Sequence, residues 1–91
     1  MKEDRALKTD PGPFRAVWRG EKTAEFRKDD WQGQVNDVVK LYEYDRATGT
    51  WIRPYRAIWI RVTHIARGYG MPDGYAMFSF KVLLRKICSR G

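Results

Sequence analysis

The chain has only one cysteine, Cys88, and one histidine, His64. A single thiol cannot form an internal disulfide, and one thiol with one imidazole cannot supply the ligands of a Cys/His zinc site. No run of about 18 apolar residues is present, and the opening MKEDRALKTD lacks the apolar core of a signal peptide. We therefore expect a cytoplasmic protein without a membrane span, metal or cofactor, in which Cys88 is a small hydrophobic side chain.

Acidic residues are also scarce, since 11 Asp and Glu accompany 18 Lys and Arg, for a formal net charge of +7 at pH 7. This excess of positive charge favours polyanionic partners, with nucleic acid first and an anionic membrane surface second. A length of 91 residues indicates one domain, over residues 1–91. Aromatic residues make up 14% of the chain and supply the bulk for one modest core, while residues 85–91 form a basic tail.

A short helix is indicated between Asp10 and Gly20. Asp10 is placed to cap the first N–H groups, Pro11 and Pro13 fall in the first turn, where a missing N–H costs nothing, and Gly20 can adopt the left-handed stop. Apolar side chains at helical spacing form one stripe for the core: Phe14, Val17 and Trp18.

Period-two alternation and an abundance of β-branched and aromatic residues predict the strands. We expect them over residues 23–27, 38–44, 56–65 and 75–84, with a short extended segment at residues 51–52 that Pro54 restricts to an edge or bend. One helix among about five strands predicts an α+β, mostly β fold: a small, mostly antiparallel barrel, which removes exposed strand edges.

The first of these strands has an apolar and a polar face. Ala24 and Phe26 are expected to face the core, whereas Glu25 and Arg27 point the other way, with Lys22 beside them. A carboxylate between two cations stays ionised and orients both, which leaves spare N–H donors for a phosphate or a base edge. This trio is a candidate binding site. The alternative is a row of solvent-facing charges on an edge strand.

The segment GEKTAEFR, residues 20–27, resembles the G-x-K-x-x-E-x-R signature of the ASCH domain, a member of the PUA-like superfamily of small β-barrels. Other segments resemble an ASCH-related family of uncharacterised function that is frequent in bacteriophages and bacteria: LKTDPGPF (7–14), RKDD (27–30), QVND (34–37) and YEYDRATG (42–49). The resemblance covers about residues 6–84, the expected core. Asn36 stands where relatives usually show glycine before Asp37, and asparagine also tolerates a left-handed turn.

The resemblance implies a barrel whose cleft, lined by the signature residues, binds RNA or acts on nucleotides. Some bacterial ASCH proteins are amidohydrolases that deacetylate N4-acetylcytidine, and Lys22 lies at the position of their catalytic lysine. Glu25 stands where their threonine nucleophile would be, although Thr23 offers a hydroxyl nearby. Glu25 would stabilise the charged lysine and oppose its action as a base. We expect RNA or nucleotide binding, with two alternatives open: an amidohydrolase acting on a modified nucleoside, or a phage accessory protein that binds a host protein.

Two aromatic residues, Trp31 and Tyr69, lie in polar, glycine-containing loops where no core pattern requires them. Each is expected either to stack on a base of single-stranded nucleic acid or to cover an end of the barrel. His64 alternates with Ile60 and Val62, which indicates a barrel-wall histidine with one satisfied nitrogen.

Further cations complete the expected binding surface. Lys8 closes the first strand segment beside the signature, as a fourth site residue or an ordinary surface lysine. Arg61 shares a strand face with Trp59, and it either flanks the cleft or covers Trp59 from outside. A diffuse phosphate-attracting field is expected from six others: Arg53, Arg56, Arg67, Arg85, Lys86 and Arg90.

Overall fold

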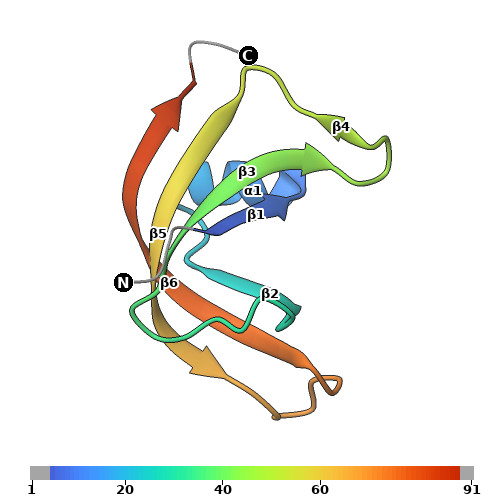
Figure 1. Ribbon diagram of the computed structural model, residues 1–91, viewed down its shortest axis with the longest axis vertical. Coiled ribbons are helices and arrows are strands. Elements are labelled where there is room, and N and C mark those ends of the chain that lie inside the picture. Colours follow the sequence, from blue (N-terminus) through green and yellow to red (C-terminus); the bar gives the residue numbers. More distant parts are fainter. Residues whose placement is uncertain (1–4, 89–91) are drawn as a thin grey trace.

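The computed structural model describes residues 5–88, so that Arg90 lies outside the described residues. The described chain is mostly β with a single short helix, as the sequence predicts (Figure 1). Its elements follow in the order β1 (Arg5–Thr9), α1 (Pro11–Trp18), β2 (Ala24–Lys28), β3 (Val38–Asp45), β4 (Thr50–Trp51), β5 (Arg56–Ala66) and β6 (Tyr75–Ile87).

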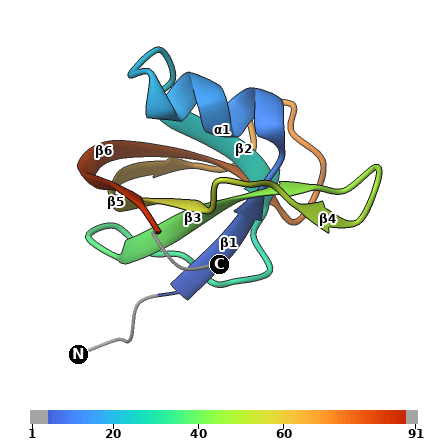
Figure 2. The same ribbon diagram turned by 90° about the horizontal axis from the view of Figure 1, so that it is seen from above.

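The strands form one curled sheet in the order β1-β3-β5-β6-β2, with β4 added to β3. All pairs are antiparallel except β1 and β3, which are parallel. Where the sequence predicts a barrel, the described strands form an open half-barrel (Figures 1 and 2). The two edge strands, β1 and β2, form no backbone ladder with each other. The opening between these edges contains the candidate site.

Helix α1 lies on the concave side of the sheet (Figure 2). Its prolines lie in the first turn and Gly20 follows its end with φ of 80°, as predicted. The predicted cap is wrong, because the Asp10 side chain makes no capping hydrogen bond and instead accepts one from the backbone N–H of Arg46. Within the described residues, no helix has the length and apolar character needed to cross a membrane.

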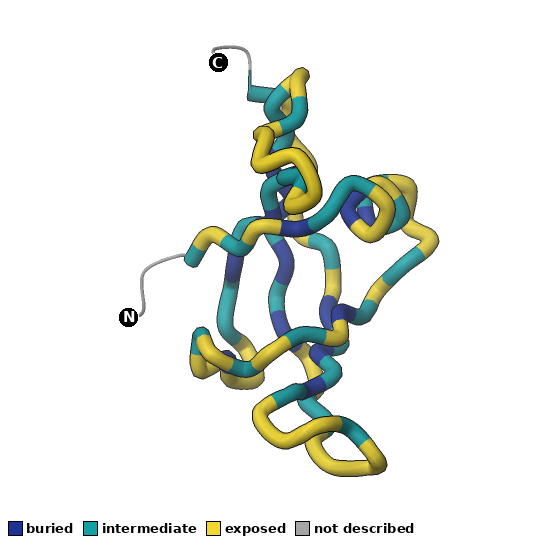
Figure 3. Tube along the Cα trace, turned by 90° about the vertical axis from the view of Figure 1, so that its right-hand side faces the viewer, coloured by how far each residue is buried: buried dark blue, intermediate teal, exposed yellow. Residues whose placement is uncertain are grey.

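The core fills the concave side in two clusters. Phe14 and Val17 of α1 pack against inward residues of the central strands: Val39, Leu41, Ile58, Ile60 and Phe80. A second cluster holds Val62, Ala76 and Phe78, and the partly buried Trp31 packs against both clusters. Buried residues follow the central strands and exposed residues gather in the connecting loops (Figure 3).

The two longest strands differ from their predicted form. β6 continues to Ile87, beyond the expected end at Leu84, because it pairs with the beginning of β5. A register shift between Val62 and His64 interrupts the alternation of β5. His64 lies on β5 but is exposed, so the prediction that it shares a face with Ile60 and Val62 is wrong.

Candidate functional site

Strand β2 turns its polar face inward, the reverse of the prediction. Glu25 is buried, whereas 46% of Phe26 is exposed. Phe26 stacks on Tyr75 of β6 with ring centroids 5.3 Å apart, so each ring shields one face of the other from solvent. The inner face can be polar here because β2 is an edge strand and the charges meet partners across the opening of the half-barrel.

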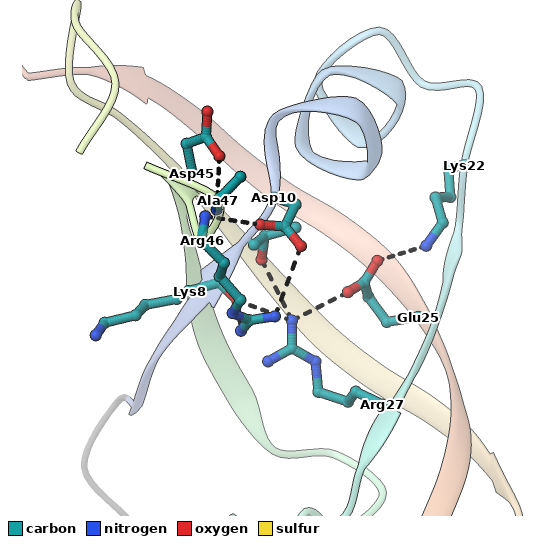
Figure 4. A network of polar contacts seen from close by, with 9 residues as sticks. Lys8, Asp10, Lys22, Glu25, Arg27, Asp45, Arg46 and Ala47 are labelled. Atoms are coloured by element: carbon teal, nitrogen blue, oxygen red, sulfur yellow. Dashed lines mark hydrogen bonds and ion pairs between the residues drawn. The ribbon is translucent and has the colours of Figure 1, made fainter. Parts of the chain in front are cut away.

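The trio predicted from the sequence does converge, and Glu25 is at its centre (Figure 4). Its Oε1 accepts a hydrogen bond from Lys22 Nζ, and its Oε2 accepts one from Arg27 Nη2 at 3.0 Å. The exposed fractions of the side chains are 33% for Lys22, 9% for Glu25 and 16% for Arg27. These charges are therefore held in a partly desolvated site, which makes their hydrogen bonds stronger than those of a surface ion pair.

Arg27 also bridges the opening between the two edge strands. Its Nη2 donates to the carbonyl oxygen of Lys8 at 3.1 Å and approaches Thr9 Oγ1 at 3.4 Å, both on β1. The same carbonyl accepts a hydrogen bond from Arg46 Nη2 at 3.0 Å. The Arg27 side chain thus links β1 and β2 where no backbone ladder joins them, and the Lys8 carbonyl oxygen brings two guanidinium groups to one point.

Asp10 and Arg46 belong to the site, although the sequence interpretation did not select them. The Arg46 backbone N–H donates to Asp10 Oδ1 at 3.2 Å, and Arg46 Nη1 lies 3.7 Å from Asp10 Oδ2. Asp45 accepts the backbone N–H of Ala47 at 2.9 Å, which shapes the turn that carries Arg46 (Figure 4). The sequence feature that could have identified Arg46 is the YEYDRATG segment, which contains it.

These residues border a cavity of about 460 Å³ along the open edge. Its lining residues come from β2, from the starts of α1 and β6, and from three loops: Asp10, Pro13, Lys22, Glu25, Phe26, Arg27, Lys28, Asp30, Arg46 and Tyr75. Four of them are cations and three are carboxylates. The volume lies within the range of about 300–1,000 Å³ that is typical of small-molecule sites. We call this cavity the edge pocket.

Two residues near the signature do not contribute their side chains to the edge pocket. Lys8 does not line the pocket: its carbonyl oxygen accepts the hydrogen bonds of Arg27 and Arg46, while its Nζ lies over the Tyr44 ring, 4.5 Å from the centroid. Thr23 is exposed and absent from the pocket lining, and its carbonyl oxygen accepts the N–H of Phe80. The hydroxyl considered as a nucleophile is therefore not in the pocket.

The other predicted binding residues lie elsewhere. Trp31 packs on Phe78, with centroids 4.9 Å apart, and so covers an end of the core, the second of its two predicted roles. Arg61 lies on the convex face of β5 and does not line the edge pocket. The cation over Trp59 is Lys40, at 5.6 Å. Tyr69 is 90% exposed at a loop, also outside the edge pocket.

Outside the pocket, Arg19 donates two hydrogen bonds to Glu21, which lowers the pKa of this exposed carboxyl group from its ordinary value. Among residues 5–88, no group of three or more His, Cys, Asp or Glu side chains is placed to hold a metal ion.

A protein-family model matches most of the chain. Residues 5–80 match a family described as "Domain of unknown function (DUF3850)". No curated protein matches the chain. The matched segment contains every residue that lines the edge pocket, so the site lies within the part of the chain that the family shares. The chain therefore belongs to the DUF3850 family.

Proposed function

We propose that this protein is an ASCH-related, nucleic-acid-binding module that holds a nucleotide, or a nucleotide of an RNA strand, in the edge pocket. One observation carries the proposal: buried Glu25 orients Lys22 and Arg27 at the wall of a cavity large enough for a small ligand. These are the residues at the lysine, glutamate and arginine positions of the ASCH-like signature.

The chemistry of the lining favours a phosphate-bearing ligand. A lysine ammonium has three donors, and Glu25 uses one of those of Lys22. Lys28 and Arg46 add two exposed cations to the lining. Cationic N–H donors make short, strong hydrogen bonds to phosphate oxygens. The cations outnumber the carboxylates of the lining, so a bound anion would balance the remaining charge.

The same geometry favours binding over amide hydrolysis. Both oxygens of Glu25 accept hydrogen bonds from cations, and Lys22 Nζ is held in an ion pair with this carboxylate. The hydroxyl of Thr23 is outside the pocket lining. A nucleophile and a base within reach of each other are the requirement of covalent catalysis, and these residues do not meet it.

A titration with the four ribonucleoside monophosphates, followed by two-dimensional amide NMR, tests the proposal. We expect shifts of the amide signals of β2 and of the 45–47 turn, and affinity that falls as salt is raised. Lys22→Ala and Lys28→Ala should each weaken binding about tenfold, the value of one lost charge-assisted hydrogen bond. Arg67→Ala is the matched control, because it removes an exposed cation that does not line the edge pocket.

The proposal fails if no monophosphate shifts these signals, or if Arg67→Ala weakens binding as much as Lys22→Ala. Release of acetate from N4-acetylcytidine by the unmodified protein, abolished in Lys22→Ala, would replace it with the amidohydrolase alternative. Recovery of one protein from nuclease-treated host lysate, with no nucleotide binding, would replace it with the alternative of a host-protein partner.

A further inference from the structure

The face of the sheet turned away from α1, here called the outer face, has a composition unlike that of the rest of the chain. The registers of the four main strands place its residues in side-by-side rows. The rows are Ala6, Lys40, Trp59 and Leu84; Lys8, Tyr42, Ala57 and Lys86; and Val38, Arg61 and Lys81. Their neighbours along the strands point into the concave core, so strand alternation places these rows outside.

The outer face carries five cations and no carboxylate: Lys8, Lys40, Arg61, Lys81 and Lys86. β5 and β6 contain no acidic residue, and the two of β3 are directed elsewhere. Glu43 is buried, where Arg15 and Arg56 pair with it, and Asp45 accepts a backbone N–H in the turn. Within residues 5–88, no carboxylate lies within ion-pair distance of any of the five cations. Their charge is therefore available to an external anion.

Aromatic rings lie beside two of these cations, Lys8 and Lys40. Tyr44 and Trp51 face each other across β3 and β4, and Lys8 Nζ lies 4.5 Å from one ring centroid and 5.7 Å from the other. Lys40 Nζ lies 5.6 Å from the centroid of Trp59 in the next row. Trp51 is exposed although it contributes a large apolar surface. Lys8 and Lys40 are thus held over rings by attraction to their π faces, without a carboxylate to neutralise them.

We propose that the outer face binds a single strand of nucleic acid, separately from the edge pocket. Unpaired cations beside exposed aromatic rings match the two parts of such a ligand, because phosphates need cations and unstacked bases need flat rings. Lys8 and Lys86 lie three strand spacings apart, about 14 Å, so the face can contact several consecutive nucleotides. An acidic protein surface would satisfy the cations alone and would leave Trp51 without a specific role.

Fluorescence anisotropy with labelled twelve-nucleotide U and dT strands tests this inference. The double variant Lys40→Gln/Lys81→Gln should bind at least tenfold more weakly, and the slope of log affinity against log salt should be reduced by about 1.4, the value for two single-strand phosphate contacts. Trp51→Ala should cost about tenfold, as expected for one lost stacked base. The U and dT strands should bind with similar affinity, since RNA and DNA share phosphates and base faces.

A matched control removes the same charge from another surface. Arg19→Gln/Arg67→Gln replaces two exposed arginines outside the outer face and outside the edge pocket. If this control weakens strand binding as much as the lysine pair, a diffuse field explains the binding and the inference is wrong. It is also wrong if Trp51→Ala has no effect and a polyglutamate chain of equal charge competes as well as U strands, because the face then recognises acidic chains in general.

Monophosphate binding separates the two sites. Lys40→Gln/Lys81→Gln should leave monophosphate affinity at the edge pocket unchanged, while Lys28→Ala should weaken it. If monophosphates fail to bind but strand binding depends on the outer face, the edge-pocket proposal falls and this inference stands. If monophosphates bind at the edge pocket but strand binding does not depend on the outer face, the edge-pocket proposal stands and this inference is wrong.

Discussion

Replacing Arg27 with alanine should lower the free energy of unfolding by about 3 kcal/mol. Breaking a buried ion pair by removing one partner typically costs about 3–5 kcal/mol, because the remaining charge is left desolvated. Without Arg27, Glu25 would keep only its ion pair with Lys22, which is one-third exposed. This pair partly compensates the charge of Glu25, so we expect a cost at the lower end of that range. The contacts of Arg27 with Lys8 and Thr9 across the open edge would also be lost.

Thermal and urea unfolding followed by circular dichroism measure the effect. For a domain of this size, 1 kcal/mol corresponds to about 4–8 °C in Tm, so we expect Tm to fall by about 12–24 °C. Arg19→Ala is the control, because both side chains of its ion pair with Glu21 are exposed, so this substitution should leave Tm almost unchanged. A loss below about 1 kcal/mol for Arg27→Ala would show that the arginine does not hold the two edge strands together.

A second variant separates charge burial from general damage to β2. Glu25→Leu/Arg27→Met removes both charges of the pair and replaces them with apolar side chains of similar length. Such replacements are often neutral or stabilising. We expect the double variant to recover at least half of the stability lost in Arg27→Ala. A double variant less stable than Arg27→Ala would contradict the explanation by an unpaired buried carboxylate.

Two further substitutions test the core. Gly33→Ala should destabilise the protein by about 1–3 kcal/mol, because a Cβ at this position would lie 2.3 Å from the Trp31 ring. Urea unfolding measures this loss, and a value below about 0.5 kcal/mol would refute the close packing of Gly33 against Trp31. Glu43→Gln should lower the free energy of unfolding by about 3 kcal/mol, because the buried carboxylate pairs with Arg15 and with the largely buried Arg56. Thermal unfolding measures this effect, and an unchanged Tm would show that the charge of Glu43 is not needed for stability.

The sequence determines the local elements of this protein. The bounds of α1 follow from residues within a few positions of each end, and Gly20 has the expected positive φ. Asn36 has φ of 77°, the left-handed conformation expected for asparagine in place of glycine. The convergence of Glu25 and Arg27 was predictable for the same reason, because residues two apart on a strand always share a side.

Long-range pairing decides what the sequence leaves open. Alternation shows that β2 has two faces, but only the partners across the open edge determine that Glu25 turns inward and Phe26 outward. His64 changes sides because the pairing of β5 with β6 introduces a register shift that no local pattern indicates.

The two proposed surfaces depend on tertiary structure in the same way. Arg46 reaches the edge pocket through contacts with Asp10, 36 residues earlier in the chain. The outer face collects residues from separate strands, and only the register of those strands places Lys40 beside Trp59. Side-chain parity is a property of a few consecutive residues, whereas strand pairing and register depend on how the whole sheet buries its core, and this is why the sites emerge only in the folded chain.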